Sequence, residues 1–274
     1  PLMRSKYVQS RIGNTYKEAE EFLKQGRKVL FVGTSCQIAG LKKFLRKEYD
    51  SLLAVDFICH GVPSPGVWRK YLDEIKTERS EAAGKNSVLN VSLNSMPEIT
   101  GINFREKQLG GYSWKKFGFV VQKSPSKGDK NTVLLSNMFQ DNAFMKAFLK
   151  NFILRPSCYS CVAKDGRSQA DFTIADFWGI EKCHSDFDDE RGCGVVFALS
   201  DKGQSVIDTL SDFMKLLDVT YQEATASNPS YYTPVGIPMK RSVFWKEYNE
   251  SKSISSATEI ATHESLYIRI RRRV

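Results

Sequence analysis

The strongest constraint on the fold comes from two short apolar runs, each followed by a polar loop and an amphipathic segment. The runs are KVLFVG at residues 28–33 and LLAVDFI at residues 52–58. Continuous apolar runs of this length indicate buried strands, and the amphipathic segments at 38–44 and 67–75 indicate helices. Because strands alternate with helices, the pattern predicts a parallel or mixed sheet with helices on its faces.

The middle of the chain differs, because strand-like segments follow one another there without a convincing helix between them. We therefore expect an α/β (α+β) protein, with a mixed sheet flanked by helices and a smaller β-rich insertion. The expected division is an α/β half at 1–85, the insertion at 86–136 and a C-terminal half of the same domain at 137–274. Further patterns predict strands at 88–93, 99–105, 114–122, 170–176, 194–199 and 219–223, and helices at 137–151, 203–217 and 241–248.

Composition excludes several classes of protein. A chain of 274 residues with 41% apolar residues can bury a sizeable core as one large domain or two small ones. The net charge of +9 favours anionic partners, but no nucleic-acid-binding signature is present, so no nucleic acid is expected. No run approaches the roughly 18 apolar residues of a membrane span, so we expect no membrane insertion and a cytoplasmic location. A homo-oligomer is compatible with this interpretation.

The six cysteines do not form the disulfide framework of a small secreted domain. Cys158 and Cys161 make a CxxC pair, a spacing found in zinc sites, iron–sulfur sites and redox dithiols. Because a polar loop follows the pair, instead of the helix that usually follows a redox dithiol, metal binding is favoured. Cys36 and Cys59 each follow a predicted strand, and parallel strands place their carboxyl ends at one sheet edge. We predict that the four thiols converge there; the alternative is that Cys36 and Cys59 are small buried residues.

Polar and aromatic groups near these cysteines have several interpretations. The loop at 33–37 opens a helix after a strand, so its free N–H groups suit a phosphate, and this feature favours an iron–sulfur cluster with a flavin over a compact zinc module. His60 is a ligand, a proton donor or an ordinary loop histidine. Trp178, close to Asp176, stacks on a ring cofactor or simply packs. The other residues of these types lack partners at informative spacing and are interpreted as structural: Cys183, Cys193, His184 and His263.

Five motifs are more specific together than any one of them alone. They are SKYVQS at 5–10, GTSCQIAGL at 33–41, DFICHGVPSP at 56–65, RPSCYSC at 155–161 and FTIADFWG at 172–179. In this order, and over most of residues 3–200, the chain closely resembles the coenzyme F420 hydrogenase/dehydrogenase beta-subunit family.

The resemblance implies an oxidoreductase subunit with FAD and at least one [4Fe-4S] cluster. Such a subunit would pass electrons between an iron–sulfur carrier, FAD and a two-electron acceptor, either a deazaflavin like F420 or another small molecule. The flavin would bind to the half at 1–85, and both cofactors to the half at 137–274. The implied cluster ligands are Cys36, Cys59, Cys158 and Cys161. The implied flavin-binding residues are Lys6, Tyr7, Gln9, Ser10, Gly33, Thr34, Ser35, Gln37, His60, Gly61, Asp176, Trp178 and Gly179.

The chain departs from the family pattern in two respects. Ser35 stands where the family usually has proline, a mild change next to Cys36. The cysteine run of an N-terminal two-cluster ferredoxin domain is missing, so we expect a separate ferredoxin-like domain or protein as the electron partner. Similar bacterial proteins are often associated with polysaccharide synthesis. Two alternatives remain open: a zinc-stabilised scaffold or binding protein without redox activity, and a flavin enzyme whose cysteines hold no cluster.

Overall fold

The computed structural model describes residues 7–85, 98–107, 114–124, 133–188 and 192–263. The chain forms two compact units. The mixed-sheet unit comprises Ser10–Gly61 and Pro156–Val235, and the antiparallel unit comprises Pro1–Gln9, Val62–Arg155 and Gly236–Val274. In the described part of the chain, no helix combines the length and apolar character needed to cross a membrane.

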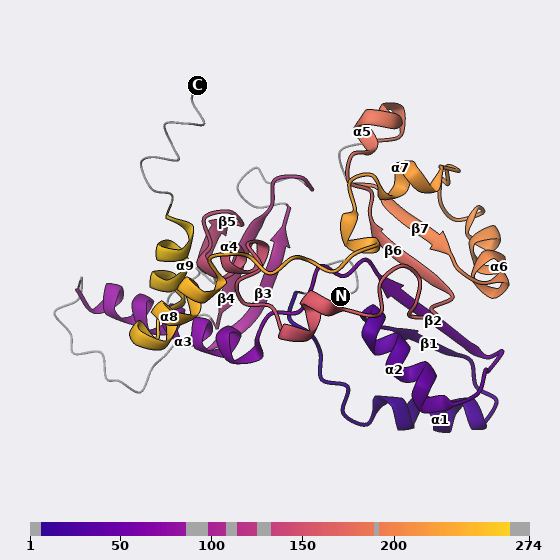
Figure 1. Ribbon diagram of the computed structural model, residues 1–274, viewed down its shortest axis with the longest axis horizontal. Coiled ribbons are helices and arrows are strands. Elements are labelled where there is room, and N and C mark those ends of the chain that lie inside the picture. Colours follow the sequence, from indigo (N-terminus) through magenta and orange to yellow (C-terminus); the bar gives the residue numbers. More distant parts are fainter. Residues whose placement is uncertain (1–6, 86–97, 108–113, 125–132, 189–191, 264–274) are drawn as a thin grey trace. The chain divides into compact units, whose positions relative to one another are not determined.

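The mixed-sheet unit is built on four strands in the order β1-β2-β6-β7 (Figure 1). β1 (Val29–Val32), β2 (Leu52–Phe57) and β6 (Phe172–Asp176) are parallel neighbours, and β7 (Gly194–Ala198) pairs antiparallel with β6. The predicted mixed sheet is therefore confirmed, including the two apolar runs that defined it.

Helices α1 (Thr15–Lys24) and α2 (Ser35–Leu45) pack against this sheet. Their apolar faces meet β2 in a cluster that includes Leu23, Leu41 and Leu52, all at most 3% exposed. The remaining helices of the unit are α5 (Ile180–Cys183), α6 (Asp201–Leu210) and α7 (Tyr221–Thr225), with 3-10 turns η2 (Pro156–Ser160), η3 (Ser185–Phe187) and η4 (Pro229–Tyr231). The packing of α1 and α2 holds β1 and β2 in place, and with them the sheet edge at which both strands end.

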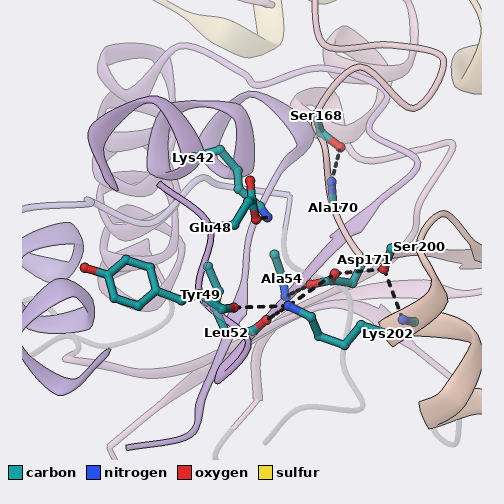
Figure 2. A network of polar contacts seen from close by, with 11 residues as sticks. Lys42, Glu48, Tyr49, Leu52, Ala54, Ser168, Ala170, Asp171, Ser200 and Lys202 are labelled. Atoms are coloured by element: carbon teal, nitrogen blue, oxygen red, sulfur yellow. Dashed lines mark hydrogen bonds and ion pairs between the residues drawn. The ribbon is translucent and has the colours of Figure 1, made fainter. Parts of the chain in front are cut away.

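A buried carboxylate, Asp171, ties β2 to the start of α6 (Figure 2). Its Oδ2 accepts a hydrogen bond from the Ala54 amide at 2.7 Å, and its Oδ1 accepts one from the Ser200 hydroxyl at 2.8 Å. The Lys202 ammonium lies 3.8 Å from Oδ1 and also donates to the carbonyl oxygen of Leu52 at 2.6 Å. Because Asp171 is only 4% exposed, these partners compensate for the burial of its charge.

The antiparallel unit contains the three-stranded sheet β3-β4-β5, formed by Ile99–Glu106, Gly118–Lys123 and Val133–Met138. Its core is aromatic: Trp68 and Phe144 have ring centroids 4.7 Å apart, and Phe104 and Phe119 5.5 Å apart. The helices of this unit are α3 (Pro65–Lys85), α4 (Ala143–Leu149), α8 (Arg241–Ser251) and α9 (Ile254–Thr262). The small antiparallel sheet confirms the expected β-rich part of the fold class.

Several predicted elements differ from the structure. The strand predicted at 219–223 is wrong, because Thr220 and Glu223 form a capping box that starts α7. The helix predicted from 137 begins only at Ala143, because Asn142 caps it and residues 133–138 continue the sheet as β5. The helix predicted at 203–217 ends at Leu210. The strand predicted at 88–93 lies outside the described residues.

Candidate metal and cofactor site

The carboxyl ends of β1, β2 and β6 lie at one edge of the mixed sheet. Val32 of β1 is in register with Val55 of β2, and Phe57 is in register with Ile174 of β6. Because the three strands are parallel, the segments that follow them emerge at the same edge. These segments carry most of the predicted site residues: Gly33, Thr34, Ser35, Cys36 and Gln37 after β1, Cys59, His60 and Gly61 after β2, and Trp178 and Gly179 after Asp176, the last residue of β6.

Cys36 is the second residue of α2, so its thiol lies in the first turn of the helix. Thr34 is the N-cap residue, and its amide donates to Gln37 Oε1 at 2.9 Å. The Thr34 hydroxyl lies 3.2 Å from Cys36 Sγ and 3.2 Å from Gln37 Oε1. A helix N-terminus favours negative charge, so it suits Cys36 as a thiolate ligand. The Thr34 hydroxyl can donate to that sulfur.

Cys59 is the most strongly perturbed thiol of the site. Burial raises its pKa to about 11, Lys164 opposes the shift, and the thiols of Cys36 and Cys158 add to it. The backbone of Gly61 lowers the pKa slightly. Cys36 and Cys158 therefore lie close enough to Cys59 to act on its charge, although more than 90 residues separate Cys59 from Cys158 in the sequence.

Cys158 lies in η2 and Cys161 directly follows it, and both thiols are half-buried. All four candidate ligands belong to the mixed-sheet unit. The structure thus brings three of the predicted thiols into one neighbourhood, and the complete ligand set stays a prediction.

Four thiols are a donor set that suits either a tetrahedral zinc ion or a [4Fe-4S] cluster. Among the described residues, no three His, Cys, Asp or Glu side chains gather closely enough to hold one metal ion. A single zinc ion needs all its sulfurs at about 2.3 Å. In a cubane cluster each thiolate ligates a different iron, so the sulfurs stand further apart.

A small pocket lies beside Cys59, lined by groups that include Ser35, Asp56, Lys164 and Tyr231. The pocket has room for about one water molecule. Asp56 is 2% exposed and accepts a hydrogen bond from Thr173, and Lys164 is 7% exposed. Sequence reasoning missed Asp56 and Lys164. Lys164 lies in a polar loop, so the sequence gives no signal that it is buried. Asp56 could have been detected, because it is an acidic residue within an apolar strand.

The remaining predicted flavin-binding residues fall into both units. Tyr7 and Gln9 belong to the antiparallel unit, where Tyr7 packs on Phe104 and Phe148 and Gln9 accepts a hydrogen bond from Arg155. Ser10 is exposed and belongs to the mixed-sheet unit. Lys6 lies outside the described residues.

Beyond β6, Trp178 is half-buried and its amide donates to the Asp176 carbonyl oxygen at 3.1 Å. Gly179 has a φ of 86°, and a side chain there would meet Ser227 Oγ at 2.7 Å. The backbone conformation of this position therefore favours glycine, and a Cβ there would also displace the Ser227 side chain. By its chemistry, the indole of Trp178 suits the ring of a flavin nucleotide, and the N–H groups at the start of α2 suit its phosphates.

Comparison with known proteins agrees with the motifs. Neither curated proteins nor solved structures give a significant match to the chain. The family model that describes the C terminus of the beta subunit of coenzyme F420 hydrogenase/dehydrogenase matches residues 26–219, well over half of the chain. The matched range contains every described segment of the sheet edge and all four candidate ligands. The chain therefore belongs to the family defined by the C-terminal part of the coenzyme F420 hydrogenase/dehydrogenase beta subunit, a family of oxidoreductase subunits.

Proposed function

We propose that the protein is an electron-transfer subunit in which Cys36, Cys59, Cys158 and Cys161 hold a [4Fe-4S] cluster and the same sheet edge contributes to an FAD site. The observation that carries this proposal is that Cys36 and Cys59 follow neighbouring parallel strands at one edge of the sheet, in the same unit as Cys158 and Cys161. When bound, the cluster would supply one-electron steps and the flavin two-electron steps.

The roles of the chain's own residues follow from their positions. The first turn of α2 favours the thiolate of Cys36, and Thr34 supplies a hydroxyl at its sulfur. We further propose a ferredoxin-like electron partner, a small-molecule acceptor such as F420, and a cytoplasmic location.

The test is the content of iron, acid-labile sulfide and flavin in the full chain after anaerobic purification. We expect about four irons and four sulfides per chain. Cys158→Ser should lose most of the iron. Cys183→Ser is the matched control, because the thiol of Cys183 bonds to carbonyl oxygens of its own helix region, and it should retain the iron.

Other outcomes would distinguish the alternatives. A colourless protein with one zinc and no sulfide would refute the cluster and favour a zinc-stabilised scaffold. Bound FAD without iron, in protein prepared and reconstituted anaerobically, would favour a flavin enzyme whose cysteines hold no cluster. Iron retained in Cys158→Ser would show that the ligand set is wrong.

A further inference from the structure

Lys164 is a buried lysine directly behind the candidate thiolate site. Only 7% of the residue is exposed, which is rare for lysine because burial removes the ammonium group from water. Its Nζ donates to the carbonyl oxygen of Cys59 and, at 2.7 Å, to that of Ser230. Both acceptors are neutral, and the buried carboxylate of Asp56 lines the same small pocket as the ammonium group.

The two hydrogen bonds connect three separate segments of the mixed-sheet unit. Cys59 lies in the loop after β2, Lys164 follows the CxxC pair by three residues, and Ser230 belongs to η4. The Asp165 amide adds a hydrogen bond to the Tyr231 carbonyl oxygen at 2.8 Å, next to the bond of Lys164 to Ser230. Lys164 therefore restrains the loop that carries one candidate ligand against the segment that carries two others.

The charge of Lys164 acts on the same sulfur site. Its Nζ donates to the carbonyl oxygen of Cys59 itself, so the ammonium group lies beside one candidate ligand. Ligand thiols are deprotonated, so an assembled site concentrates negative charge, and reduction adds one more electron. In a buried setting, where the dielectric screening is weaker than in water, a fixed cation favours the reduced state.

We propose that Lys164 is a positioning and charge-setting residue of the thiolate site: it fixes the Cys59 loop through its two carbonyl contacts and raises the reduction potential of the group held there. This inference rests on the proposed cluster. Two separable roles follow, one that depends on hydrogen-bond donors and one that depends on positive charge.

Three variants of the full chain separate these roles. Lys164→Arg keeps the charge and the donors, Lys164→Gln keeps donors without the charge, and Lys164→Met loses both. The measurements are iron content, the midpoint potential from an anaerobic redox titration followed by paramagnetic resonance, and thermal unfolding of the metal-free protein.

We expect Lys164→Gln to keep iron but to disfavour reduction about tenfold, a shift of about 59 mV to more negative potential for a one-electron couple. Lys164→Arg should stay close to the parent potential. Lys164→Met should lose iron as well, because two buried carbonyl groups lose their donor. A lower melting temperature of the metal-free Met variant would support the same positioning role.

Two results would overturn the inference. A parent-like potential in Lys164→Gln would refute the charge role, and parent-like iron content and melting temperature in Lys164→Met would refute the positioning role. Both results are distinguishable from failure of the proposed function. If the proposed function fails, the parent protein itself holds no cluster.

Discussion

Replacement of Asp171 by alanine should strongly destabilise the mixed-sheet unit. The carboxylate accepts hydrogen bonds from the Ala54 amide at 2.7 Å and the Ser200 hydroxyl at 2.8 Å (Figure 2). Hydrogen bonds to a charged group contribute about 1.5–3 kcal/mol each. The variant would also leave the buried amide of Ala54, in the interior of β2, without that acceptor.

These contributions are not additive, so we expect a loss of about 3–5 kcal/mol, the range typical for breaking a buried charged pair. Asp171→Asn keeps the shape but offers only one acceptor oxygen, and it should lose roughly half as much. Asp50→Ala is the matched control, because Asp50 is exposed, and its effect should stay within about 0.5 kcal/mol.

The assay should report on the mixed-sheet unit alone, because two units can unfold separately. Hydrogen–deuterium exchange of peptides that cover Leu52–Phe57 does so. A loss of about 4 kcal/mol corresponds to roughly 1,000-fold lower protection of the β2 amides, provided that they exchange by global opening of the unit. Equal protection of β2 in the Asp171→Ala and Asp50→Ala proteins would refute the idea that this carboxylate holds β2 to α6.

Three further predictions concern the site and its support. Thr34→Val should make the midpoint potential of the cluster more negative than Thr34→Ser does, because only serine keeps a hydroxyl for Cys36 Sγ; equal potentials in a redox titration would contradict this. Gly203→Ala should unfold the protein at lower temperature, because the new Cβ would lie 2.2 Å from the Asp171 carbonyl oxygen; an unchanged melting temperature would exclude the clash. In metal-free protein, burial raises the pKa of Cys59 from 9.0 to about 11. The free energy of unfolding should therefore fall as the pH rises from about 9 to 11, because the unfolded state loses this thiol proton first. Urea titrations of Cys59→Ser should lack this part of the fall.

The sequence predicted the mixed sheet well because its strands carry a local signal. The apolar runs around Val29–Val32 and Leu52–Phe57 are short, continuous and bounded by polar turns, so they indicate buried strands without any knowledge of partners. The error at Tyr221–Thr225 has the opposite cause. There the capping box of Thr220 with Glu223, which is a signal for the start of a helix, determines the structure.

The candidate site shows the same division between local and distant information. The positions of Cys36 and Cys59 after parallel strands could be predicted, because strand ends meet at one sheet edge. The contact of Lys164 with Ser230 could not, because it joins residues 66 positions apart whose segments have no periodic pattern. Asp56 is an intermediate case. An acidic residue in a buried strand signals a special role in the sequence, but its hydrogen-bond partner Thr173 follows only from the pairing of β2 with β6.

The middle stretch of the antiparallel unit, Val62–Arg155, begins and ends at neighbouring points. The Arg155 amide donates to the Val62 carbonyl oxygen at 2.9 Å, and the Ser64 amide donates to that of Ile153 at 2.8 Å. The two ends of this stretch are therefore held together by backbone hydrogen bonds. A short linker from Gly61 to Pro156 could replace it with little cost in loop-closure entropy, as is usual where domains have been inserted. All four candidate ligands lie outside this stretch, whereas α9 of the same unit packs on α3 and α4 inside it.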